Sequence, residues 1–171
     1  HEDLAVLINL IGGHSKNRLP NDFSRVEELD NLGSAWSVLN ERPYVFLSSG
    51  SVFGPTLSSP IESDRVPKSR SDLSPYSQSK LMAEQRHLVL RSQGVKVHDL
   101  RIFSYAGPKF IKNGSYFLTA LLNSVKTQSA FKVEGLDFVR DYIGSQELAQ
   151  AVFSCISSNR GLAANLHSGE P

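Results

Sequence analysis

The stretch Tyr44–Gly54, YVFLSSGSVFG, decides the fold class that this sequence predicts. Residues 44–47 are mostly aromatic or β-branched, which favours a strand. They run directly into the small polar residues of 48–51, so we expect the strand to end in a turn. In a parallel sheet, ligands bind outside the carboxyl ends of the strands. The stretch therefore predicts a buried strand and, at its end, a place for a functional site.

Apolar runs and helical patterns alternate on both sides of this stretch. Leu4–Leu10 (LAVLINL) is a continuous apolar run, which predicts a strand buried on both faces. At Ser74-Pro75 a helix is expected to begin, because serine is a favoured cap and proline fits the first helical position. The predicted strands are Leu4–Leu10, Tyr44–Leu47, Val95–Phe103 and Ala163–Leu166, and the predicted helices are Val26–Glu41, Ser74–Gln93, Phe117–Val125 and Ser145–Ile156, the last capped by Ser145. This alternation predicts an α/β fold with a parallel sheet covered by helices on both sides.

The helix at Val26–Glu41 is predicted from the helical spacing of its apolar residues, and Pro43 ends it. Those residues are Leu29, Leu32, Trp36 and Leu39. The segment Pro55–Leu73 is polar and contains two further prolines, so it predicts a loop.

The composition is that of one globular domain over residues 1–171. Of these residues 40% are hydrophobic, and the formal net charge is +1. Near-neutral charge gives no reason to expect nucleic acid or an anionic membrane as a partner. No apolar run reaches the roughly 20 residues that a membrane helix needs. The single cysteine, Cys155, is expected to pack in the core, and the default location is the reducing cytoplasm.

Two residues of the helix that follows the loop are candidates for proton transfer. Tyr76 and Lys80 are four residues apart, so their side chains fall on one face of the helix. A nearby ammonium stabilises a phenolate and lowers the tyrosine pKa from about 10 towards neutrality. Ser49, at the end of the preceding strand, could hold the substrate oxygen. The alternative is structural: such pairs are often a solvated helix face, and serine-rich turns satisfy backbone groups.

Four stretches in succession carry a resemblance to a known family. They are YVFLSSGSVFG, SPYSQSK, LRIFSYAGP and VRDYIGSQELAQAV, and the terminal NLHSGEP adds to them. Together they resemble the extended short-chain dehydrogenase/reductases of the NAD-dependent epimerase/dehydratase family. The resemblance implies a partial Rossmann-like parallel sheet with flanking helices. It also implies NAD or NADP as cofactor and a nucleotide sugar as substrate.

The resemblance also implies a role for each matching position. Tyr76 would be the general acid/base, Lys80 would hold the nicotinamide ribose, and Ser49 would bind the reacting hydroxyl or carbonyl. Ser48, Gly50 and Phe103 would lie along the nicotinamide pocket, and Ser51, Ser104 and Arg140 would contact the substrate. Arg140 would bind the diphosphate through its guanidinium fork, or alternatively pair with Asp137 or Asp141.

The sequence departs from the family pattern at its beginning. The family opens with a strand, a GxxGxxG turn and a helix that receives the cofactor pyrophosphate. The sequence holds no such motif, and Gly12-Gly13 does not match it. The resemblance thus covers the C-terminal half of the cofactor-binding domain and the start of the substrate region. Ser104 also stands where the family usually has asparagine.

These departures leave two hypotheses about function. In the first, the chain is an NAD(P)-dependent enzyme of nucleotide sugars, whose Ser/Tyr/Lys centre is shared by epimerases, dehydratases and reductases. In the second, it is a truncated, non-catalytic remnant or fragment that acts only as an interaction or oligomerisation module. We expect a homo-oligomer in either case. It would form through the apolar edge strand Leu4–Leu10, or through the helices Val26–Glu41 and Tyr76–Gln93 as in the family.

Overall fold

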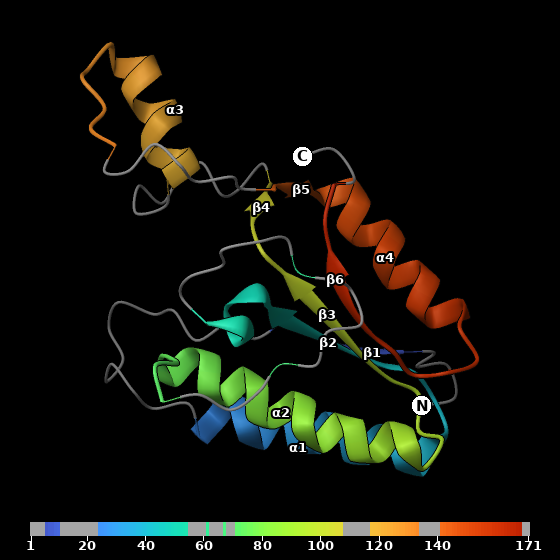
Figure 1. Ribbon diagram of the computed structural model, residues 1–171. Helices are drawn as coiled ribbons and strands as arrows, with labels where there is room; N and C mark the ends of the chain where they lie inside the picture. Colours follow the sequence, from blue (N-terminus) through green and yellow to red (C-terminus); the bar gives the residue numbers. More distant parts are fainter. Residues whose placement is uncertain are drawn as a thin grey trace.

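The computed structural model describes residues 6–10, 24–54, 61, 67, 71–107, 117–133 and 141–168. Its main sheet has four parallel strands in the order β1 (Leu7–Asn9), β2 (Tyr44–Ser49), β3 (Val97–Ile102) and β6 (Ala163–Leu166) (Figure 1). The short strands β4 (Tyr105–Ala106) and β5 (Ile143–Gly144) form a second parallel pair. The predicted α/β class with a parallel sheet is confirmed.

Helices cover both faces of the main sheet. The helices α1 (Ser24–Asn40) and α2 (Pro75–Ser92) lie side by side on one face, and α4 (Ser145–Ser157) covers the other (Figure 1). The helix α3 (Phe117–Thr127) stands away from the sheet, beyond β4 and β5. A single turn of 3₁₀ helix, η1 (Gly50–Phe53), follows β2 directly. No helix in the described part of the chain is long and apolar enough to span a membrane.

The first strand differs from its prediction. Within residues 6–10, only Leu7–Asn9 is strand, and the predicted residues before position 6 lie outside the described ones. Ile8 is 38% exposed and Leu10 68% exposed, so the strand is not buried on both faces. β1 is at the edge of the described sheet, where one neighbour, β2, covers it on one side only.

The helix α1 forms where predicted, but the residues of its predicted apolar stripe are not its buried ones. Its buried positions are Val26, Asp30, Gly33 and Ser37, spaced three or four residues apart. By contrast, Leu32 is 61% exposed and Leu39 is 82% exposed. Gly33 explains the choice of face, because a Cβ there would lie 2.5 Å from the Tyr44 ring. Leu32 and Leu39 of the predicted stripe therefore point outward, Leu29 and Trp36 are partly buried, and the inward face is made mostly of small and polar residues.

The residues predicted to begin and end α2 do so, whereas the residue predicted to cap α4 does not. Ser74 caps α2 by accepting a hydrogen bond from the Ser77 amide (3.1 Å), and Pro75 occupies the first helical position, as predicted. Gly94, at φ +86°, takes the left-handed conformation just after α2. The predicted cap of α4 is wrong, because the cap residue is Gly144, which has no side chain to cap with. The Ser145 hydroxyl is instead 2.9 Å from the Tyr105 hydroxyl.

Apolar clusters fill both faces of the sheet. Under α2 the buried residues are Tyr44, Phe46, Ala83 and Val97. Under α4 they are Val45, Leu100 and Cys155. Burial raises the pKa of the Cys155 thiol to about 11, so the thiol stays protonated at neutral pH. Cys155 is thus a core residue, as predicted.

Candidate functional site

The candidate site lies where the carboxyl end of β2 meets the first turns of α2. Strand β2 runs two residues further than predicted, so that Ser48 and Ser49 belong to it and pair with Arg101 and Ile102 of β3. Successive side chains on a strand point to opposite faces. The side chains of Ser48 and Ser49 therefore face opposite sides of the sheet and have different partners.

Ser48 is turned towards α2. Its hydroxyl is buried and donates a short hydrogen bond of 2.5 Å to Glu84 Oε1. We predicted that Ser48 lines the nicotinamide pocket. Since the hydroxyl proton is already engaged by Glu84, the Ser48 side chain cannot donate to a ligand while that bond is kept.

Ser49 is half-buried and starts the 3₁₀ turn η1. Its backbone is extended, and its Oγ accepts a hydrogen bond from the Ser51 amide (3.2 Å). This bond fixes the position of Oγ at the end of the strand. Because Oγ is the acceptor, the hydroxyl proton can still be directed at a bound oxygen.

Tyr76 and Lys80 come together on the inner side of α2, as their spacing predicts. Lys80 is 1% exposed, and its Nζ donates a hydrogen bond to the Leu47 carbonyl (2.8 Å). Nζ lies 4.2 Å from the centre of the Phe46 ring and 6.0 Å from that of the Tyr76 ring. The ammonium is thus held between the end of β2 and Tyr76.

Burial governs the charge of Lys80. It lowers the pKa of this amine to about 8, although the negative charges of Asp30, Glu84 and Asp99 oppose the shift. At pH 7 the amine is therefore still mainly protonated. A buried cation in this place favours the ionised form of a neighbouring tyrosine.

Gly50 and Phe103 are in direct contact. A Cβ on residue 50 would lie 2.3 Å from the Phe103 ring, so a residue with a side chain cannot stand there without moving the ring. Phe103 in turn stacks on Phe53, with ring centres 6.2 Å apart and an interplanar angle of 8°. Residues predicted to line one pocket thus lie side by side at the ends of β2 and β3.

The three residues predicted to contact the substrate, Ser51, Ser104 and Arg140, differ in what the structure shows for them. The Ser51 hydroxyl is buried and has no hydrogen-bond partner among the described residues. Such a group is rare in proteins and suits a ligand oxygen. The Ser104 carbonyl accepts a hydrogen bond from the Ile143 amide (3.1 Å), which joins the segment between β3 and β4 to β5. Arg140 lies outside the described residues.

Sequence reasoning missed Glu84 and its partners. Glu84 Oε2 accepts hydrogen bonds from Arg101 Nε (2.9 Å) and Nη2 (2.8 Å), and all these groups are buried. Burial raises the pKa of Glu84, although the bonds from Arg101 and Ser48 oppose this. The signal was available, because Glu84 follows Lys80 by four residues and so lies on the same helix face.

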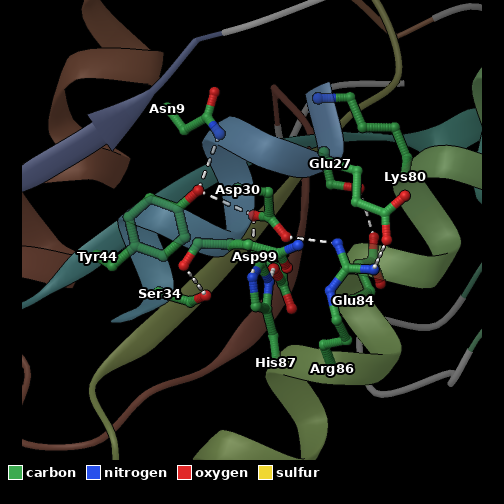
Figure 2. Close-up of polar contacts among 12 residues, drawn as sticks. Asn9, Glu27, Asp30, Ser34, Tyr44, Lys80, Glu84, Arg86, His87 and Asp99 are labelled. Atoms are coloured by element: carbon green, nitrogen blue, oxygen red, sulfur yellow. Dashed lines mark hydrogen bonds and ion pairs between the residues drawn. The ribbon is translucent and has the colours of Figure 1, made fainter. Parts of the chain in front are cut away.

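A second buried network lies further along α2 (Figure 2). His87 Nδ1 is 2.6 Å from Asp99 Oδ1, and its Nε2 is 3.1 Å from Asp30 Oδ1. Burial alone would lower the pKa of His87, but the two carboxylates outweigh it and raise this pKa to about 9. A protonated His87 therefore links α2 to α1 and β3. Asp30 also accepts a hydrogen bond from the Tyr44 hydroxyl (2.9 Å).

The polar side chains of the candidate site differ from those of a metal centre in the described ranges. Within the described ranges, no group of three or more His, Cys, Asp or Glu side chains is placed to hold a metal ion. A buried ammonium, a half-buried tyrosine and the Ser51 hydroxyl instead offer polar atoms to a neutral or anionic organic ligand. Such a set can orient an oxygen and move its proton.

Residues 4–165 match the model of the NAD dependent epimerase/dehydratase family. The fold resembles UDP-N-acetylglucosamine 4-epimerase from Bacillus cereus, with a TM-score of 0.72 and 19% identity over 96% of this chain and 58% of that one. For UDP-glucose 4-epimerase from Brucella ovis in complex with NAD, the TM-score is 0.71 at 19% identity, covering 97% and 58%. For RMD from Pseudomonas aeruginosa complexed with NADPH, it is 0.65 at 22%, covering 97% and 61%. The chain thus spans about three fifths of the length of these proteins. No curated protein sequence matches it.

Proposed function

The chain belongs to the NAD dependent epimerase/dehydratase family, and from this premise we propose that it carries the Ser/Tyr/Lys centre of an enzyme that acts on a nucleotide sugar. NAD or NADP would be its cofactor, and a bound nicotinamide would take up and return a hydride. The observation that carries the proposal is the buried Lys80, held between the Leu47 carbonyl and Tyr76 at the end of a parallel strand.

Each residue of the centre then has a distinct role. Tyr76 would exchange a proton through its hydroxyl with the reacting oxygen of the sugar. Lys80 would favour the ionised tyrosine through its charge, and it would contact the nicotinamide ribose. Ser49 would donate a hydrogen bond from its hydroxyl to the same sugar oxygen. Ser51, whose buried hydroxyl has no partner in the described region, would accept or donate a further hydrogen bond. Gly50 and Phe103 would form the wall beside the nicotinamide, and Arg140 and Ser104 would contact the substrate.

The proposal can be tested by calorimetric titration of the chain with NAD⁺ and NADH. We expect micromolar binding that falls at least tenfold in Lys80→Met, because the variant keeps the length of the side chain but loses the ammonium. Tyr76→Phe should change binding less than about threefold, because it removes a proton-transfer group rather than a charge. Lys126→Met, at an exposed lysine of α3, is the matched control.

The opposite result would support the non-catalytic alternative. If the folded chain takes up neither nucleotide at millimolar concentration, the Ser/Tyr/Lys residues do not work as a cofactor site in this polypeptide. Circular dichroism of each variant separates such a result from a loss of folding.

We also propose that the chain forms a homo-oligomer in the cytoplasm. The observation behind the oligomer is the outward apolar face of α1 and α2, where Leu32, Leu39, Met82 and Val89 are all more than half exposed. The edge of β1, with Ile8 and Leu10, is the competing surface. A reducing compartment agrees with a single, buried cysteine.

A further inference from the structure

The Glu84 carboxylate joins three elements at the candidate site. From its place on α2, Oε1 accepts the hydrogen bond of Ser48 on β2, and Oε2 accepts two from Arg101 on β3. Each oxygen is thus committed to a different strand. One side chain therefore links the helix that carries Tyr76 and Lys80 to the strand that carries Ser49.

The network continues from Arg101 in two directions. Arg101 Nη1 donates to Asn165 Oδ1 on β6 (3.3 Å). The guanidinium also lies over the Phe53 ring at 5.2 Å, and Phe53 belongs to η1, the turn that begins after Ser49. The contacts of Glu84 therefore reach both sides of the candidate site, through β2 and through η1.

The burial of Glu84 and Arg101 indicates that their ion pair fixes the local geometry more than it stabilises the fold. The Glu84 and Arg101 side chains are each only 4% exposed. Removing two charges from water costs free energy that their attraction barely offsets, so a buried ion pair contributes little net stability compared with apolar residues. It does enforce one geometry, because Oε2 contacts both Nε and Nη2 of Arg101 while Oε1 accepts from Ser48, so the carboxylate is held from two strands at once.

We propose that Glu84 is a positioning residue, which fixes α2 against the carboxyl ends of β2 and β3 and so sets the place of Tyr76 and Lys80 relative to Ser49. Its importance for catalysis rests on the proposed function. The positioning itself is a property of the protein without ligand. It can therefore be tested independently of cofactor binding.

The test is native-state hydrogen exchange on the full chain, comparing Glu84→Gln, Glu84→Ala and the matched control Asp99→Asn. Asp99 is also buried and also pairs with α2, but through His87 and Arg91, further towards the end of that helix. In Glu84→Ala, we expect the amides of residues 48–53 to exchange at least tenfold faster, beyond any change in global stability. Glu84→Gln should restore most of the protection, because an amide can still accept from Arg101 and donate to Ser48.

Two results would overturn the proposal. One is a uniform rise in exchange over all strands, which would make Glu84 a general stabilising residue. The other is equal loosening of residues 48–53 in Asp99→Asn, which would show that any buried charge on this side of the sheet has the same effect. Failure of the proposed function would be seen separately, as lack of nucleotide binding by a wild-type chain whose residues 48–53 are protected.

Discussion

Lys80 shows how single residues set the chemistry of the candidate site. Its ammonium is buried, and its pKa of about 8 reflects the cost of burial against the attraction of three carboxylates, Asp30 on α1, Glu84 on α2 and Asp99 on β3. Glu84→Gln removes one of these charges and leaves the Arg101 cation without its counter-charge. We therefore expect the Lys80 pKa to fall below about 8, measured from the ¹³Cε shift of labelled lysine and assigned with Lys80→Met.

The control for this prediction is Glu28→Gln, which removes an exposed carboxylate of α1. It should leave the Lys80 titration unchanged, because water screens an exposed charge. An unchanged or higher pKa of Lys80 in folded Glu84→Gln would show that Glu84 does not contribute to the charge of this amine.

At the residue scale, the sequence predicts local relations well and distant ones poorly. The Tyr76–Lys80 pair follows from a spacing of four within one helix, and the structure places both at the end of β2. The contact of Gly50 with Phe103 joins residues more than fifty positions apart, so no local pattern reveals that residue 50 has no room for a side chain. Glu84 and Arg101 could be noted as charges, but their burial depends on the packing of α2 against the sheet.

At the scale of elements, periodicity predicts that a helix forms but not which face it buries. The apolar spacing of α1 correctly predicts a helix, yet the face that packs inward carries Asp30, Gly33 and Ser37. The reason lies in β2, since the Tyr44 ring fills the space above Gly33 and its hydroxyl donates to Asp30. The large Tyr44 side chain therefore selects a small and polar helix face.

Two buried histidines, His87 on α2 and His98 on β3, should make the free energy of unfolding depend on pH. The pKa of His87 is raised to about 9, so its contribution is complete below about 6.5 and is lost as pH rises through 9. The pKa of His98 is lowered to about 4 by burial, so its neutral form favours folding above about 6.5, and stability is lost as pH falls towards 4. We expect the free energy of unfolding in urea to be greatest near about pH 6.5. The His87 contribution would be on the order of 3 kcal/mol.

Substitutions separate the two limbs of this pH profile. His87→Gln should flatten the decline between pH 7 and 9, and His98→Leu should flatten the rise between pH 4 and 6.5. The shape of each profile is the measure, since both variants also change the absolute stability. The comparison with wild type is decisive, because the lowered pKa of Lys80, about 8, makes stability rise above that pH in both proteins and opposes the His87 decline. If His87→Gln leaves the slope between pH 7 and 9 unchanged, His87 is not held as a cation between Asp30 and Asp99.

At the scale of the whole molecule, the side of the sheet covered by α1 and α2 buries charged residues beside its apolar core and also exposes large apolar residues on the outer face of both helices. Leu32 and Leu39 of α1, and Met82 and Val89 of α2, are each seven residues apart, so each pair lies on one helix face. That face is opposite the buried positions of the same helix, and the two helices lie side by side (Figure 1). Exposed apolar residues gathered on neighbouring helices are typical of an interaction surface. A second copy of the chain is the partner we propose, because two such helix pairs can bury each other's apolar faces.

Light scattering coupled to size-exclusion chromatography tests this arrangement against the edge of β1. We expect the wild-type chain to be a dimer, and Leu39→Lys with Met82→Lys to make it a monomer, because charges at the centre of an apolar interface cannot be desolvated cheaply. Phe153→Lys, at an equally exposed apolar residue of α4 on the other face, is the matched control and should remain dimeric. If Ile8→Lys alone abolishes the dimer while the double variant keeps it, the copies pair through the β1 edge instead. In that case the exposed apolar residues of α1 and α2 serve a contact other than the dimer. The buried polar residues of these two helices then matter only for the networks of Glu84 and His87, which hold the helices against the sheet.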